Sequence, residues 1–60
     1  DQVQALAEAT ANGFAAAGIK DVADIYRATV YDLLAGGDVS DAMDVAKQGF
    51  SRLQKIKQVA

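Results

Sequence analysis

Apolar residues recur at every third or fourth position along this chain, in three stretches separated by glycine. Gly18 follows the first stretch, and Gly36-Gly37 follows the second, with Asp38 directly after it. Apolar side chains at this spacing share one face of an α-helix. Apolar and polar residues do not alternate with period two over more than a few residues, which argues against β-strands. The pattern therefore predicts an all-α chain of three amphipathic helices.

The first helix is expected over Gln2–Ala17. Gly13 lies inside it and costs roughly 1 kcal/mol relative to alanine, so it marks either a close helix crossing or a tolerated weak point. Gly18 suits the left-handed position that ends many helices. Asp21 is positioned to cap the next helix with its side chain. The apolar face of the first helix comprises Val3, Leu6, Thr10, Gly13 or Phe14, and Ala17.

The second helix is expected over Val22–Ala35, with an apolar arc of about half its circumference that predicts contact with two neighbours. Tyr31 falls on its polar side. It is a candidate exposed contact residue, although tyrosine also commonly lies along a surface with its hydroxyl in water. The arc comprises Val22, Ala23, Tyr26, Val30, Leu33 and Leu34, with Ile25 and Thr29 at one edge.

The third helix is expected over Val39–Gln58, after the firmest boundary in the chain. Gly36-Gly37 stops the preceding helix, and Asp38-Val39-Ser40-Asp41 resembles a capping box. Aspartates come first in this helix and lysines and arginine come last, an order that complements the helix dipole. A binding role for the basic end is the alternative interpretation. The apolar stripe comprises Val39, Ala42, Met43, Ala46, Phe50 and Leu53.

Short links favour antiparallel neighbours, so we expect an antiparallel three-helix bundle in a single small domain. If Gly18 bends the chain without ending the helix, the alternative is a long helical hairpin. The residues expected to pack in the core or at an interface are Leu6, Phe14, Ile19, Val22, Tyr26, Val30, Leu33, Val39, Met43, Phe50 and Leu53.

Sixty residues provide little burial to offset the entropy of the chain. Cysteine and histidine are absent, which excludes disulfides and the usual zinc ligand sets. We therefore expect the chain to associate with itself, with another protein or with a hydrophobic surface. Because the sequence begins at Asp1, we also expect it to be a fragment or the ordered part of a longer chain.

Composition also narrows the function. Without histidine or cysteine the common catalytic triads are impossible, and aspartates three residues apart do not match a calcium loop. We expect no enzyme activity and no cofactor. The net charge of −2 and the aspartates that open the third helix argue against nucleic acid. The sequence contains no transmembrane segment of about 18 apolar residues. It does not identify the compartment, although the cytoplasm is favoured.

The chain resembles the phasins, bacterial helical proteins that coat polyhydroxyalkanoate granules. The residues that carry this resemblance are Ala5-Leu6, Ala9, Gly18, Tyr26, Leu33-Leu34-Ala35, Asp38, Ala42 and Phe50. The resemblance implies apolar stripes that pack in a bundle or spread on a granule surface. A fainter resemblance, to the three-helix albumin-binding modules of bacterial surface proteins, rests on Leu6-Ala7-Glu8-Ala9 and Ala17-Gly18-Ile19.

Three hypotheses follow from the sequence. The first is a non-catalytic assembly or surface-coating protein that buries its apolar helix faces on copies of itself or on a hydrophobic surface. The second is a compact three-helix protein-binding module. The third is a structural subunit of a helical or phage-type assembly, for which the alanine-rich first helix would allow close packing.

Overall fold

A computed structural model describes residues 1–59 of the chain, with side chains for residues 1–58. It contains three helices: α1 (Gln2–Ala16), α2 (Lys20–Ala35) and α3 (Val39–Val59). Each helix packs against the other two, and the described residues form no strand. The predicted all-α bundle is therefore confirmed.

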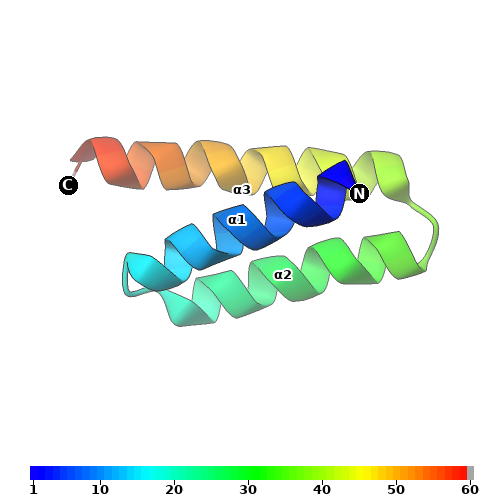
Figure 1. Cartoon of the computed structure of the whole chain (residues 1–60), viewed down its shortest axis with the longest axis horizontal. Helices are drawn as coiled ribbons and strands as arrows, with labels where there is room; N and C mark the ends of the chain where they lie inside the picture. The colour runs from blue at the N-terminus through cyan, green and yellow to red at the C-terminus, as the bar shows by residue number, and fades with distance from the viewer. Residues whose placement is uncertain (60) are drawn as a thin grey trace.

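The helices run up, down and up along the long axis of the molecule. In Figure 1, α2 and α3 flank α1, α2 runs antiparallel to both of the others, and the C-terminal end of α3 extends past them. The end of α3 projects because this helix is longer: α3 has 21 residues, whereas α1 has 15 and α2 has 16. The result is an elongated body with Cα extents of 36 × 17 × 14 Å.

Both links end a helix in the same way. Gly18 and Gly37 have φ values of +85° and +84°, which residues with a side chain rarely adopt. The Ile19 amide donates to the Phe14 carbonyl at 3.1 Å, and the Asp38 amide donates to the Leu33 carbonyl at 2.9 Å. These are the hydrogen bonds of a Schellman motif. Gly18 therefore ends α1, and the alternative of a continuous helical hairpin is wrong.

The start of α2 differs from the prediction, since Asp21 does not cap it. The helix begins two residues early, at Lys20, with Ile19 at the N-cap and no capping hydrogen bond from a side chain. Ile19 completes the Schellman motif through its amide while its carbonyl accepts from the Ala23 amide at 3.1 Å. Because one residue closes α1 and opens α2, Asp21 already lies inside the first turn.

The core is formed mainly by small side chains. The buried positions of α3 are Ala42, Ala46, Gly49 and Leu53, at steps of four, three and four residues. Small side chains allow the helix axes to approach closely, and a few large ones fill the remaining space. The other buried residues are Val3, Ala7, Thr10, Ala11 and Phe14 on α1 and Ala23, Tyr26 and Val30 on α2.

Two glycines leave space for side chains of a neighbouring helix. A Cβ atom on Gly49 would overlap the Tyr26 ring, and one on Gly13 would overlap the end of the Leu53 side chain. Gly13 therefore marks a close helix crossing, one of the two interpretations of its position. Gly49 was not singled out from the sequence.

Tyr26 joins all three helices. Its hydroxyl donates to the Ala46 carbonyl of α3 at 2.9 Å in a buried hydrogen bond. Its ring packs edge-on against Phe14 of α1, with centroids 5.8 Å apart and an interplanar angle of 68°. An aromatic ring with a satisfied hydroxyl is well suited to this central position.

Among the predicted packing residues, the structure buries some and exposes others. Phe14, Tyr26, Val30 and Leu53 are buried. A second group lies half-buried at the edge of the core: Leu6, Ile19, Leu33 and Met43.

Val22, Val39 and Phe50 are exposed by 44%, 55% and 42%, so their assignment to the core was wrong. The predicted stripes contained Ala23, Ala42 and Ala46 as well, but the list of packing residues took only the larger side chains of each stripe. The buried strip of α3 instead runs through small residues such as Ala42 and Ala46, which leaves Val39 and Phe50 outside the core. On α2 the buried strip runs through Ala23, Tyr26 and Val30, which leaves Val22 outside it.

Candidate interaction surface

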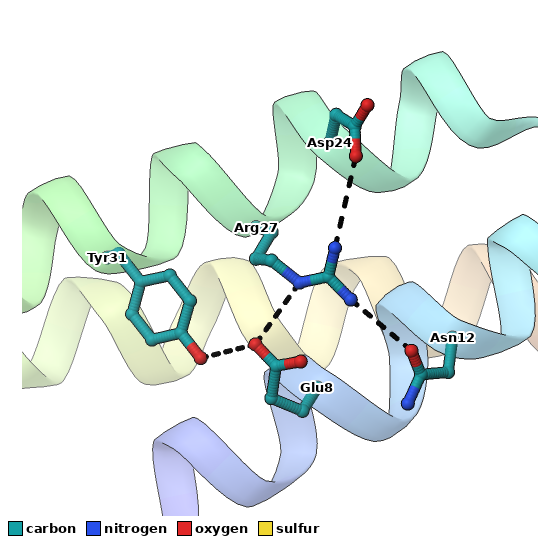
Figure 2. Close-up of polar contacts among 5 residues, drawn as sticks. All are labelled: Glu8, Asn12, Asp24, Arg27 and Tyr31. Carbon is teal, nitrogen blue, oxygen red and sulfur yellow. Dashed lines mark hydrogen bonds and ion pairs between the residues drawn. The ribbon is translucent and has the colours of Figure 1, made fainter.

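A cluster of polar side chains spans α1 and α2 on the surface. Figure 2 shows Glu8 of α1 lying between two side chains of α2, Tyr31 and Arg27. The Tyr31 hydroxyl donates to Glu8 Oε2, and Arg27 Nε donates to the same oxygen at 3.1 Å. The guanidinium also donates to Asn12 Oδ1 at 3.3 Å and lies 3.9 Å from Asp24 Oδ1.

This cluster changes the interpretation of Tyr31. The side chain was a candidate exposed contact residue, but it is half-buried and its hydroxyl is bound within the chain. Position in sequence could not show this, because Tyr31 and Glu8 are 23 residues apart. Only the packing of α2 against α1 brings them together.

The electrostatics of the cluster follow from its hydrogen bonds. The Tyr31 hydroxyl, aided by Arg27, holds the pKa of Glu8 below its ordinary value despite partial desolvation. The same hydrogen bond, together with burial and the negative charge of Glu8, raises the pKa of Tyr31. Glu8 is therefore ionised at neutral pH and is a weak proton acceptor. The cluster is suited to fixing how α1 and α2 align.

An apolar groove lies between α2 and α3. It encloses about 350 Å³. Buried Phe14 and Tyr26 contribute to its lining, as does Gly49, whose missing side chain leaves space for the tyrosine ring. The residues that line the groove are Phe14, Val22, Ile25, Tyr26, Thr29, Val45, Gln48, Gly49 and Arg52.

Exposed aliphatic side chains concentrate at the α2 edge of this groove. Ile25 is 68% exposed, more than any other large hydrophobic side chain among residues 1–58, and Val22, three residues earlier, is 44% exposed. Exposed apolar side chains gathered at a groove mark interaction sites more often than scattered ones do. We call the groove together with these two residues the α2–α3 groove surface.

The α3 edge of the groove is polar and charged. Gln48 and Arg52 line the groove, and Lys47, Ser51 and Lys55 continue the same exposed surface. Phe50 and Val39 lie elsewhere, because neither lines the groove and helical spacing places them on another flank of α3. The α2–α3 groove surface is thus the site at which exposed apolar side chains coincide with a hollow.

The described part of the chain shows neither a metal cluster nor a membrane span. Its acidic side chains do not gather in threes that could hold a metal ion. Among residues 1–59, every helix is too short or too polar to cross a bilayer.

Comparisons with known proteins give no relative. No protein-family model, curated protein or solved structure matches this chain.

Proposed function

We propose that the chain is a non-catalytic protein-binding module that uses the α2–α3 groove surface to bind an apolar helix face of another protein chain. The observation that carries this proposal is the exposure of Ile25 and Val22 beside a preformed groove. An amphipathic helix lays its apolar face into such a groove in a recurring mode of recognition. The cytoplasm remains the favoured compartment.

The closed bundle supports a binding module over a spreading coat. Val30, Phe14 and Leu53 are buried against neighbouring helices, so spreading the helices on a granule would first expose the core. The Schellman motifs and the Tyr26 anchor hold the helices in the folded arrangement. Binding through the groove requires no such opening.

The test uses an amphipathic helical peptide of leucine and lysine as the probe, titrated into the labelled chain and followed by amide NMR. We expect shift changes confined to Phe14 and to residues 22–29 and 45–52, which line the groove. Ile25→Lys is expected to weaken peptide binding by about tenfold or more, since it places a charge in an apolar contact.

Ala5→Lys is the matched control, because Ala5 is exposed on α1 and does not line the groove. It introduces the same charge and should leave the affinity unchanged. Absence of binding, or equal losses from both variants, would contradict the proposal.

A further inference from the structure

One exposed face of α3 carries charges arranged symmetrically about its middle. Asp41 and Asp44 precede Gln48, and Arg52 and Lys55 follow it, at steps of three, four, four and three residues. This spacing places all five side chains on one side of the helix. All five are exposed. We call this set the α3 charged face.

Residues at equal distances before and after Gln48 carry opposite charges. Asp44 and Arg52 each lie four residues from Gln48, and Asp41 and Lys55 each lie seven residues from it. An antiparallel copy of α3 aligned at Gln48 would therefore place both aspartates opposite basic residues. A parallel copy in register would place like charges together, so the pattern selects the antiparallel orientation.

We propose that a second copy of this chain docks on the α3 charged face and the adjoining groove, related by a two-fold axis at Gln48. Each copy then pairs Asp41 with Lys55 of the other copy, and Asp44 with Arg52. A two-fold interface uses the same surface on both copies and must be self-complementary, as this charge pattern is. The inference rests on the proposed function and identifies the partner as the chain itself.

The groove supplies the apolar part of this contact. Gln48 and Arg52 belong to the α3 charged face and also line the groove beside Ile25. A copy that docks on both surfaces covers the exposed Ile25 side chain, and because a two-fold interface uses the same surface on both copies, the apolar α2 edge with Ile25 is also what that copy brings to the contact. Burial of apolar surface provides most of the affinity, whereas the exposed ion pairs set orientation and register.

The dimensions of the molecule fit a weak dimer. Cα extents of 36 × 17 Å across its broad side allow each copy to bury up to about 600 Å², which is the low end for specific interfaces. We expect a dissociation constant on the order of 100 µM. Association of this strength is measurable for a chain of this size by sedimentation equilibrium.

The first test is crosslinking through Gln48→Cys. The natural chain has no cysteine, so the new thiol has no other partner, and the two-fold axis brings it next to its own copy. Gln54→Cys is the matched control, since Gln54 is exposed on the same helix but is rotated about 120° from Gln48. Under mild oxidation Gln48→Cys should form covalent dimers at least about tenfold faster. Equal rates would overturn the inference.

The second test exchanges charges between copies. Two double variants reverse the charges of one half of the face each: Asp41→Lys/Asp44→Lys and Arg52→Glu/Lys55→Glu. Each variant alone should weaken self-association by about tenfold or more, because like charges then meet. An equimolar mixture of the two variants should restore a heterodimer in sedimentation. Lys20→Glu/Lys57→Glu carries the same charge change away from this face and should dimerise as the natural chain does.

Circular dichroism of each variant confirms that the helices persist, and restoration in the mixture shows that neither variant has lost its fold. A natural chain that stays monomeric up to about 1 mM would overturn the inference. If such a monomer still binds the leucine–lysine peptide in the groove, the proposed function stands and only the identity of the partner is wrong.

Discussion

At the scale of single residues, the spaces left by two glycines decide how closely the helices pack. The Tyr26 ring occupies the position where Gly49 would carry a side chain, and the end of Leu53 occupies that position at Gly13. The two contacts differ in how easily they can yield. Tyr26 is rigid and anchored through its hydroxyl to Ala46, whereas the obstacle at Gly13 is the end of a flexible side chain.

Gly49→Ala should therefore destabilise the bundle more than Gly13→Ala. Alanine gains roughly 1 kcal/mol of helix propensity at both positions. Overpacking against the fixed ring exceeds this gain and leaves a net loss of about 1–2 kcal/mol at Gly49. Because Leu53 can change rotamer, the loss at Gly13 should be smaller by about 1 kcal/mol. Urea denaturation of both variants measures this difference, and equal losses would contradict the assigned roles.

At the scale of the elements, the two links are equivalent in geometry although their sequences differ. Gly36-Gly37-Asp38 contains two glycines and an acidic residue, whereas Gly18 stands alone before Ile19. The sequence therefore ranked the second boundary as firmer. The structure gives both the same left-handed glycine and the same closing hydrogen bond, because each glycine must turn the chain between packed antiparallel helices.

Gly18→Ala and Gly37→Ala should each lower the free energy of unfolding by about 1 kcal/mol, the cost of a left-handed residue that carries a Cβ atom. Gly36→Ala is the matched control, since its φ is −81° and a Cβ there meets only ordinary contacts. That variant should be neutral or stabilising by up to about 1 kcal/mol. Thermal melts compare the three. A loss at Gly37 without a loss at Gly18 would restore the bent-helix interpretation.

At the scale of the whole molecule, the stability of the bundle should depend on pH at both extremes. Glu8 has a lowered pKa, so its contribution is present above the ordinary value of 4.5 and is lost as pH falls through the folded-state pKa. Tyr31 has a raised pKa, so its contribution is present below the ordinary value of 10.0 and is lost as pH rises through the folded-state pKa. Burial also raises the pKa of Tyr26, which adds to the alkaline loss.

Denaturation of the chain across this pH range should show a plateau bounded by an acid and an alkaline decline. Glu8→Gln should flatten part of the acid decline, because it removes the group with the lowered pKa. Tyr31→Phe should flatten part of the alkaline decline and leave the part due to Tyr26. An acid decline of unchanged slope in Glu8→Gln would show that the α1–α2 cluster does not contribute to the pH dependence.

The candidate site was only partly predictable. Val22, Tyr26 and Phe14 line the groove. All three were singled out from the sequence, but only as residues that pack in the core or at an interface. Ile25 was placed at the edge of the apolar arc, which agrees with its exposure at the groove. Gly49 and the bonding of Glu8 to Tyr31 carried no signal in the local pattern, because both depend on side chains of another helix.

The sequence by itself determined the three helices, their approximate ends and the glycines between them, since helix propensity, apolar spacing and left-handed turns act over a few residues. Only the tertiary structure decided which narrow strip of each helix faces the core. That choice depends on how closely two helix backbones can approach, and small residues such as Ala42, Ala46 and Gly49 allow the closest approach. The larger Val22, Val39 and Phe50 were left outside, and with Ile25 and Ile56 they are the exposed large apolar side chains of the described residues.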